Sequence, residues 1–201
     1  MRVEIDEVLQ FWFGDLVGGF PVNDRENIWW KGGAELDREI DALFGARVNA
    51  ALRGELNEWR QTPRGRLAMV VLLDQFTRNM YRGMAEAFKG DDIARSIVME
   101  SLEKQHDEAL EFAERMFFYM PLQHAESLDM QDLCISRLES LLLDVPLKDR
   151  YRVHSAIDFA SQHRDMIIRF GRFPHRNQVL GRESTAEELA FLNQSHHRWG
   201  Q

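Results

Sequence analysis

The sequence has little cysteine and no long apolar run. Its single cysteine, Cys134, has no partner for an internal disulfide. The longest apolar run, from Leu67 to Leu73, is far shorter than the roughly 20 residues that a membrane-spanning helix needs. The N-terminus has no basic stretch followed by an apolar run and a small-residue cleavage site. These absences argue against a disulfide-stabilised secreted domain and against a membrane protein, and they predict a cytoplasmic location.

Several motifs of enzyme and metal chemistry are also absent. The sequence contains no GxSxG nucleophile motif, no GxxxxGK[ST] or GxGxxG phosphate-binding loop, and no HExxH or CxxC metal motif. We therefore predict no metal ion and no cofactor. If the protein is an enzyme, catalysis must come from acid-base side chains. The candidates are Asp74, His124, Glu126, His163 and His175.

Length and composition predict one folded domain. The chain has 201 residues, 44% of them hydrophobic, and no linker-like stretch, so we expect one well-filled core over residues 1–201. Its formal net charge is −8. An acidic chain lacks the broad basic surface on which extended nucleic-acid binding depends, so no nucleic-acid partner is expected. No sequence feature sets an oligomeric state, and the N-terminal aromatic residues are assigned to the core: Phe11, Trp12, Phe13, Trp29 and Trp30.

Apolar residues repeat at helical spacing through most of the chain, which predicts an all-α fold. For example, Ile5, Val8 and Trp12 lie on one helix face, and Gly14 ends the pattern. About eight helices in antiparallel pairs are expected, and no segment is predicted as a strand. The helices cover residues 4–13, 36–52, 67–80 (after a start at Pro63), 91–104, 107–118, 121–143, a stretch ending near 170, and a last helix after 184, with a short helical turn at 28–30.

The start of the last helix is marked by capping residues. Ser184 and Glu187 fit a capping box, in which each side chain binds a backbone N–H of the other. Thr185 and Glu188 offer the same pattern one residue later. Both starts are consistent with the sequence.

A polar cluster follows the most apolar part of the chain. Residues 67–73 are apolar on nearly all sides, which predicts a central buried helix. The continuation of this helix carries polar side chains at spacings of three, four and seven, and therefore on one face: Gln75, Arg78, Asn79 and Arg82. Asp74 lies four residues before Arg78 and is placed to orient it. The cluster is interpreted either as part of a ligand pocket or as a satisfied buried network.

The segment 163–182 is strongly basic in an acidic protein. It contains five arginines, two histidines and a single acid, so its formal charge is +4 and the rest of the chain sums to −12. Apolar residues interleave the arginines, which indicates packing against the core. Arginine held beside apolar surface is preorganised to bind carboxylate or phosphate with a fork of donors. We therefore predict an anion site with ligands from this segment, namely Arg169, Arg172, His175, Arg176 and Asn177.

A third polar block, YMPLQHAE at 119–126, is predicted to begin a helix at Pro121. His124 is a candidate proton carrier and a candidate ligand-binding residue. Its alternative interpretation is a structural hydrogen-bond donor. Glu126 is explained by the helix dipole, which favours an acid in a first turn.

Four segments resemble the motifs of one mainly bacterial family. They are VLQFWFG (8–14), LLDQFTRNMYRG (72–83), YMPLQHAE (119–126) and HRDMIIRFGRFPHRNQVLGRESTAEELAFL (163–192). On these segments the chain is identified as a member of the domain of unknown function 924 family over about residues 5–192. The resemblance implies an all-helical fold of tetratricopeptide-like architecture, and no established activity, substrate or cofactor.

Three interpretations of the polar blocks stay open. The first is a tetratricopeptide-like binding module whose arginines hold a carboxylate or phosphate on a metabolite or a peptide. The second is an enzyme for a small anionic substrate, in which His124 or His175 moves a proton. The third is a purely structural network, with the function elsewhere. The first two require that Arg78 and Arg176 meet around one water-accessible hollow.

Overall fold

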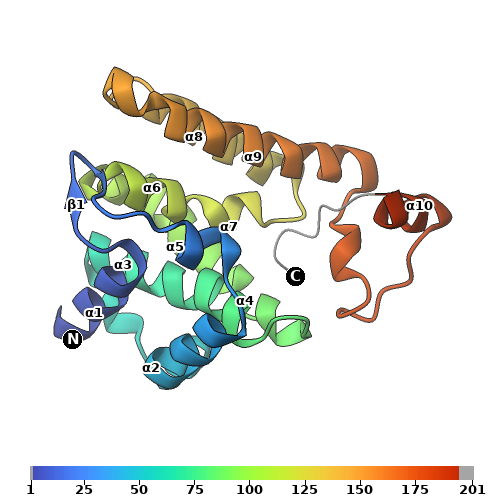
Figure 1. The fold of residues 1–201 in the computed structure, drawn as a ribbon, viewed down its shortest axis with the longest axis horizontal. Helices are drawn as coiled ribbons and strands as arrows, with labels where there is room; N and C mark the ends of the chain where they lie inside the picture. Colours follow the sequence, from blue (N-terminus) through green and yellow to red (C-terminus); the bar gives the residue numbers. More distant parts are fainter. Residues whose placement is uncertain (1, 195–201) are drawn as a thin grey trace.

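A computed structural model describes residues 2–194 of the chain. Most of these residues lie in helices (Figure 1). The α-helices are α1 (Arg2–Phe13), α2 (Ala34–Leu52), α3 (Pro63–Val70), α4 (Thr77–Met80), α5 (Asp91–Glu103), α6 (Phe112–Phe118), α7 (Met120–Gln123), α8 (Leu128–Leu141), α9 (Arg150–Phe170) and α10 (Ala186–Gln194). Short 3-10 or π-helical segments are η1 (Asn27–Lys31), η2 (Asn57–Gln61), η3 (Val71–Phe76), η4 (Ala85–Phe88), η5 (His106–Ala109), η6 (Leu147–Asp149) and η7 (Pro174–Arg176). The predicted all-α class is confirmed.

A two-stranded antiparallel pair is the one departure from this class within residues 2–194. It joins β1 (Leu16–Val17) to β2 (Phe20–Pro21), and the sequence did not predict it. Two residues a strand are too short for an alternating pattern to be visible. Over the same residues, no helix combines the length and the apolar character that crossing a membrane requires.

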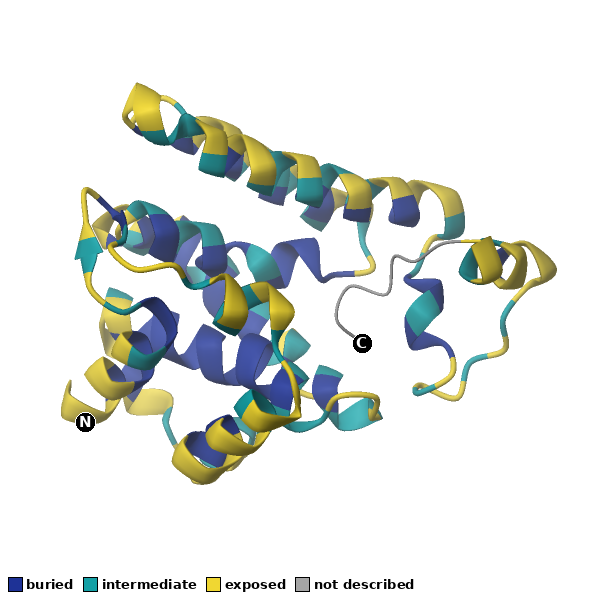
Figure 2. Ribbon diagram, viewed as in Figure 1, coloured by how far each residue is buried: buried dark blue, intermediate teal, exposed yellow. Residues whose placement is uncertain are grey.

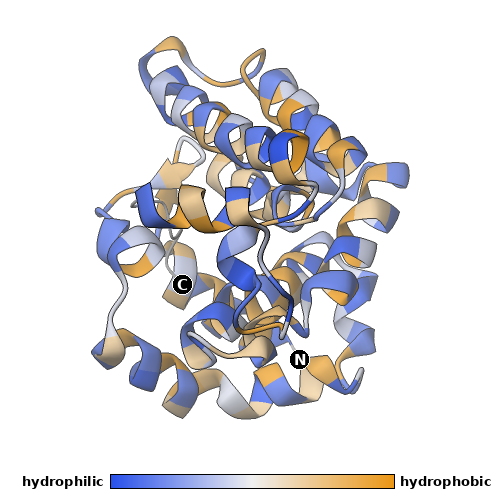
Figure 3. Cartoon of the chain, turned by 90° about the vertical axis from the view of Figure 1, so that its right-hand side faces the viewer, coloured by the Kyte–Doolittle hydropathy of each residue, from blue (hydrophilic) through white to orange (hydrophobic). Residues whose placement is uncertain are grey.

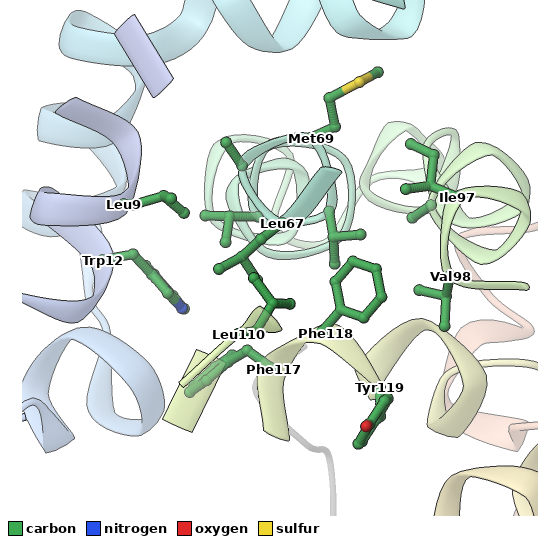
Figure 4. Packing of buried hydrophobic residues seen from close by; sticks show 14 of the residues in the cluster. Leu9, Trp12, Leu67, Met69, Ile97, Val98, Leu110, Phe117, Phe118 and Tyr119 are labelled. Carbon is green, nitrogen blue, oxygen red and sulfur yellow. The ribbon is translucent and has the colours of Figure 1, made fainter. Parts of the chain in front are cut away.

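A continuous helical rod formed by α3, η3 and α4 lies at the centre of the molecule. Thr62 caps its start, because its Oγ1 accepts a hydrogen bond of 3.1 Å from the backbone N–H of Gly65. Every residue from 67 to 73 is completely buried, and the rod is dark blue along most of its length in Figure 2. Figure 4 shows Leu67 surrounded by side chains from other elements, among them Leu9 and Phe118. The predicted central helix is therefore confirmed.

The rod changes to π-helical geometry where its polar residues begin. η3 spans Val71–Phe76, and Thr77 donates its hydroxyl hydrogen to the carbonyl oxygen of Leu73 at 2.8 Å. Such π-helical turns inside longer helices frequently mark functional sites. Gly90 packs directly on this turn, since a Cβ built at Gly90 would lie only 2.1 Å from the carbonyl oxygen of Leu73. This close approach brings the start of α5 beside η3.

N-terminal aromatic side chains pack against the rod. The ring of Trp12 lies edge-on to Phe76 at 5.5 Å and to Phe117 at 5.6 Å between centroids. Trp12 and Phe13 are almost completely buried, as predicted. Trp30 is 54% exposed, so its assignment to the core is wrong. It stacks on the surface side of Phe117 instead, with ring planes 19° apart.

The hairpin of α8 and α9 packs against α7 and leads to the C-terminal segment. Val153 and Ala160 of α9 join the main core, while the outer face of the hairpin is exposed (Figure 2). α9 ends at Gly171, whose φ of 69° is left-handed, as the sequence predicted. Figure 3 views the molecule from the side of η7 and α10, and hydrophilic and hydrophobic positions alternate along its helices. The tetratricopeptide-like pairing of all helices stays a prediction.

Two predicted helices are broken in the structure. Residues 107–118 divide into η5 and α6, because the Glu114 carboxylate accepts a hydrogen bond from the backbone N–H of Glu111 at 3.0 Å and starts a new helix there. Residues 121–143 divide into α7 and α8, because the side-chain amide of Gln131 donates to the carbonyl oxygens of Gln123 and Ala125 at 2.5 and 2.8 Å. The second break opens the loop that forms the site.

The last helix uses the later of the two predicted caps. The carboxylate of Glu188 accepts from the backbone N–H of Thr185 at 2.7 Å, and the Thr185 hydroxyl accepts from the N–H of Glu188 at 3.2 Å. Ser184 does not cap α10, since its hydroxyl accepts a hydrogen bond from Asn177 at 3.0 Å. α10 therefore starts at Ala186.

Candidate functional site

A buried carboxylate and a histidine form a hydrogen-bonded pair at the centre of the site. Asp74 lies in η3 and is completely buried. Its carboxylate contacts Nδ1 of His124, which ends α7, at 2.8 and 3.0 Å, and Nη1 of Arg78 at 3.1 Å. Burial on its own would raise the pKa of Asp74, but the charge of Arg78 and the contact with His124 lower it to about 2. Asp74 is therefore ionised at neutral pH.

The ionised carboxylate fixes the tautomer of His124. A carboxylate only accepts hydrogen bonds, so Nδ1 of the neutral ring carries the hydrogen and Nε2 holds the lone pair. Burial and the charge of Arg78 lower the pKa of His124, against the opposing effect of Asp74. Within residues 2–194, no hydrogen bond is made by Nε2, and His124 lies on the wall of a pocket. The side chain is thus neutral and basic at Nε2.

Arg78 is fully engaged by its neighbours. Its Nη1 and Nη2 bind the two oxygens of Asp91 at 3.0 and 3.1 Å. Nη1 also donates to the carbonyl oxygen of Asp74 at 2.6 Å, in addition to the ion pair with its carboxylate. Gly90 makes this arrangement possible, since its missing Cβ lets the start of α5 bring Asp91 to the rod. Arg78 therefore orients Asp74 and Asp91 and balances their charges, and it does not line the pocket.

Arg176 is the second arginine of the cluster, and it is only partly bonded. Its guanidinium lies between the rings of Phe88 and Phe173, at 4.7 and 4.5 Å from their centroids. Nη1 donates to the carbonyl oxygen of His124 at 3.1 Å, whereas Asp91 lies 3.6 Å away, which is beyond a good hydrogen bond. The buried Nε has no partner among the described residues. Burial and the charge of Arg78 lower the pKa of Arg176 to about 10.

These groups meet at a pocket of about 530 Å³ between η4, α5, the 124–127 loop and η7. Arg78 and Arg176 thus come together around Asp91, and Arg176, but not Arg78, lines the hollow beside them. The wall carries charges of both signs. Its lining residues are Phe88, Asp91, Asp92, Arg95, His124, Ala125, Glu126, Ser127, Met130 and Arg176.

Glu126 and Gln75 support this pocket from two sides. Glu126 lies in the loop before α8 and not in a helical turn, so its prediction from the helix dipole is wrong. Its carboxylate accepts the backbone N–H of Phe173 at 2.8 Å and binds Arg182 at 2.6 and 2.9 Å. Glu126 therefore ties the C-terminal segment to the loop of His124. Gln75 donates to Asp74 at 2.5 Å and lies 3.6 Å from the sulfur of Met120.

The remaining two histidines of the prediction lie behind the pocket wall. The His175 ring is 5.7 Å from the ring of Phe173, and burial and the charge of Arg176 lower its pKa to about 3. The His163 ring is 6.1 Å from that of His124, and its Nδ1 contacts the carbonyl oxygen of Phe159 at 2.9 Å. Burial and the nearby His124 lower the pKa of His163 to about 3. Neither histidine lines the pocket.

The structure separates five other predicted ligand residues from this pocket. Asn79 and Arg82 bind Asp37 of α2 at 2.8 and 2.9 Å instead. The others belong to a network around α10: Arg172 binds Glu188 at 2.7 and 2.9 Å, Asn177 donates to Glu188 at 3.3 Å, and Arg169 binds Glu187 at 2.8 Å. Arg169 and Arg172 line a second, smaller hollow.

Sequence reasoning missed Asp91 and Phe88. Asp91 starts a helix, where an acid is ordinarily explained by the helix dipole, and Phe88 has the pattern of a core residue. Gly90 was the available signal, since a glycine beside a helix start is consistent with close backbone approach. Among residues 2–194, no group of three or more His, Cys, Asp or Glu side chains is arranged to hold a metal ion.

Comparison with known proteins identifies a family and a structure with a similar fold, and both are described as being of unknown function. A family model described as a bacterial protein of unknown function (DUF924) matches residues 8–196. A solved structure of a protein of unknown function from Agrobacterium tumefaciens is 31% identical, with a TM-score of 0.79, and the match covers 96% of this chain and 99% of that one. No curated protein matches the chain.

Proposed function

The chain belongs to the bacterial family of unknown function DUF924, and from its own site we propose that it binds a small molecule through a carboxylate or phosphate group. The ligand occupies the pocket beside His124, and its anionic group contacts the guanidinium of Arg176. The family supplies no ligand, so the proposal depends on the contacts of this chain alone.

The supporting observation is the incomplete bonding of Arg176. A buried guanidinium normally has its five N–H donors matched by acceptors, because an unmatched buried donor costs about 1–3 kcal/mol. Arg78 makes three hydrogen bonds, to the backbone of Asp74 and to both oxygens of Asp91. Arg176 has one hydrogen bond, to the carbonyl oxygen of His124, and a distant carboxylate. Two aromatic rings hold its plane in place. An anionic group in the pocket would bind Nη2 of Arg176, which makes no hydrogen bond within residues 2–194 and, unlike Nε, is not a buried atom.

The mixed charge of the wall narrows the ligand class. Asp92 lies at the rim with an exposed side chain, and Arg95 pairs with it at 2.7 Å. A small ligand with one or two anionic groups matches this wall better than a more highly charged polyanion, because a polyanion would also face Asp91 and Asp92. Two charge-assisted hydrogen bonds contribute roughly 3–6 kcal/mol, and a Kd of 1 mM corresponds to about 4 kcal/mol. We expect a Kd on the order of 1 mM or below.

Isothermal titration calorimetry with inorganic phosphate, succinate, glutamate and glycylglycine tests the proposal. We expect the wild-type protein to bind at least one of these probes and Arg176→Gln to lose that binding. Arg169→Gln is the matched control, since Arg169 lies outside the pocket and pairs with Glu187. Met130→Trp fills the pocket from its wall and leaves Arg176 intact, so it should also abolish binding.

Two results would overturn the proposal. The first is the absence of heat and of thermal stabilisation for all four probes with the wild-type protein. The second is binding that survives both Arg176→Gln and Met130→Trp. Circular dichroism of each variant separates the loss of the pocket from the loss of the fold.

A further inference from the structure

The same pocket holds a side-chain pair arranged for proton transfer, and we infer that His124 is a general base that activates water to hydrolyse a carboxylic ester. The inference rests on the proposed binding function, because Arg176 holds the anionic group of that ester. It goes beyond binding in assigning a reaction and a role to each member of the Asp74–His124 pair.

The two nitrogens of His124 have opposite environments. Nδ1 is held by both oxygens of Asp74 at 2.8 and 3.0 Å. Nε2 makes no hydrogen bond with the described part of the chain, and the residue lies on the pocket wall. A second hydrogen bond at Nε2 would be expected if this ring only joined two parts of the fold. This ring instead has one nitrogen fixed and the other available to a bound water.

The environment of His124 also differs from that of the neighbouring histidine. His163 is 3% exposed, binds the backbone carbonyl of Phe159 in its own helix, and does not line the pocket. Its ring is 6.1 Å from that of His124. His163 is therefore a matched control that shares the neighbourhood of His124 but lacks contact with the carboxylate of Asp74 and with the pocket.

The reaction needs no partner beyond water. Nε2 of His124 accepts a proton from water while the water oxygen forms a bond to the carbonyl carbon of the ester. The bond between this carbon and the alcohol oxygen then breaks, and the leaving alkoxide takes the proton from Nε2. One water is consumed, and one carboxylic acid and one alcohol are released. His124 returns to its neutral state with Nε2 free.

Asp74 is a positioning residue in this scheme. It orients the ring and keeps the hydrogen on Nδ1, and its negative charge stabilises the imidazolium that forms when Nε2 accepts a proton. Arg78 and Gln75 hold the carboxylate in turn, at 3.1 and 2.5 Å. The carboxylate is therefore preorganised before the ester arrives.

Hydrolysis of two chromogenic esters tests the inference. We expect the full chain to hydrolyse the para-nitrophenyl monoester of succinate faster than para-nitrophenyl acetate, which lacks the anionic group. His124→Gln should lower kcat for the succinate ester by roughly 100-fold or more, because general-base catalysis contributes about that factor. His163→Gln should stay near the wild-type rate. Arg176→Gln should raise KM for the succinate ester by a larger factor than for the acetate ester, because only the succinate ester carries the anionic group.

The pH dependence of kcat/KM separates a catalytic role of Asp74 from a purely structural one, because a structural residue would not change the midpoint of the profile. The kcat/KM of the wild-type protein should fall on acidification with a midpoint below 6.5, the ordinary value for histidine. Asp74→Asn removes the charge that raises the pKa of His124, so we expect the midpoint to move to lower pH and kcat to fall. Nitrogen-15 NMR of the histidine rings should show the hydrogen leaving Nδ1. If Asp74→Asn does not fold, Met130→Trp gives an independent test, since it blocks the pocket without touching the pair.

Binding and catalysis fail in distinguishable ways. If succinate binds but the wild-type protein hydrolyses neither ester above the buffer rate, the inference is overturned and the proposed binding function stands. If succinate does not bind and the acetate ester is still cleaved by a His124-dependent route, the binding proposal fails and the catalytic role survives. If His163→Gln and His124→Gln reduce the rate equally while both fold, His124 has no special role.

Discussion

At the scale of single residues, the hydrogen-bond partners of Arg78 and Arg176 give the two guanidinium groups different roles. Arg78 and Arg176 both face Asp91, but Arg78 makes two hydrogen bonds to it and Arg176 makes a contact of 3.6 Å. Arg78 also balances the buried charge of Asp74. The first arginine holds the polar centre together, and the second has bonding capacity left for a ligand.

Arg78→Met should destabilise the fold strongly. It leaves the carboxylates of Asp74 and Asp91 without their main counter-charge, and breaking a buried ion pair from one side costs about 3–5 kcal/mol. Urea unfolding would measure this loss. Arg95→Met is the comparison, because it removes an ion pair to the highly exposed Asp92 and should cost less than about 1 kcal/mol. Equal losses in the two variants would contradict this account.

His163 should make the protein less stable in acid. Burial lowers its pKa to about 3 from 6.5, so below pH 6.5 the unfolded chain binds a proton that the folded chain excludes. The free energy of unfolding should therefore fall by about 1.4 kcal/mol per pH unit as the pH drops from about 6 toward 4.

His163→Phe tests this pH dependence, since it removes this titrating group and should reduce the slope by about 1.4 kcal/mol per pH unit, while the contributions of His175 and His124 remain. His154→Phe replaces an exposed histidine of the same helix and serves as the control. Urea midpoints at several pH values give both slopes. An unchanged slope in His163→Phe would show that other groups cause the acid sensitivity.

The sequence allowed the arginine pair to be predicted but not its central acid. The basic segment and the polar end of the rod stood out by charge against an apolar background, so a meeting of Arg78 and Arg176 was a reasonable expectation. Asp91 gave no such contrast, because it lies beside another acid, Asp92, at a helix start. Arg172 and Asn177 were expected in the same pocket, but the buried carboxylate of Glu188 binds both.

At the scale of secondary-structure elements, the contact between the π-helical turn and the start of α5 builds the site. η3 places Asp74 in the core, and Gly90 lets α5 approach until Asp91 reaches Arg78. The backbone of one element thus lies against the backbone of another with no side chain between them.

Gly90→Ala should separate these two elements. A Cβ at this position would lie 2.1 Å from the carbonyl oxygen of Leu73, so α5 must move. We expect a loss of about 2–3 kcal/mol, as for other overpacked sites, and weaker succinate binding. Gly18→Ala is the matched change, because nothing lies near Gly18 and only its positive φ adds a cost of about 1 kcal/mol. A Gly90→Ala protein with unchanged stability and binding would refute the role of this contact.

Helix positions followed from periodicity, while helix breaks depended on single distant side chains. The rod, α2, α5 and the end of α9 lie where apolar spacing, Pro63 and Gly171 predicted them. The break between α7 and α8 arises because Gln131 binds the carbonyls of Gln123 and Ala125. A glutamine on a helix has no distinguishing pattern, so the sequence could not predict this contact. The break matters, since it places His124 and Glu126 at the pocket.

At the scale of the whole molecule, the pocket joins a large core to a small C-terminal unit. Most buried apolar residues form one cluster from Ile5 to Ala160, whereas Met166, Ile167 and Phe173 form a separate one. The C-terminal unit, defined as residues 171–194, contributes Arg176 to the pocket wall. Its attachment depends mainly on polar contacts, including those of Glu126 with Phe173 and Arg182. One wall of the pocket therefore belongs to a unit that has few apolar contacts with the main core.

This division predicts uneven local stability. Amide hydrogen exchange should be faster in residues 174–194 than in the rod at 63–80, because elements with few buried apolar contacts open at lower cost. Succinate should slow exchange in 174–194, since it contacts Arg176 and stabilises the closed unit. Exchange in the rod should change little.

Glu188→Gln tests the division directly. Glu188 is 2% exposed and joins Arg172, Asn177 and Thr185, so its loss should loosen α10 and η7 together. We expect faster exchange in residues 174–194, a higher Kd for succinate and unchanged exchange in the rod. Glu187→Gln is the paired control, because Glu187 is exposed and binds Arg169 at the surface. If Glu188→Gln raises exchange in the rod as much as in 174–194, the C-terminal unit opens only with the core, and the pocket wall is part of one cooperative fold.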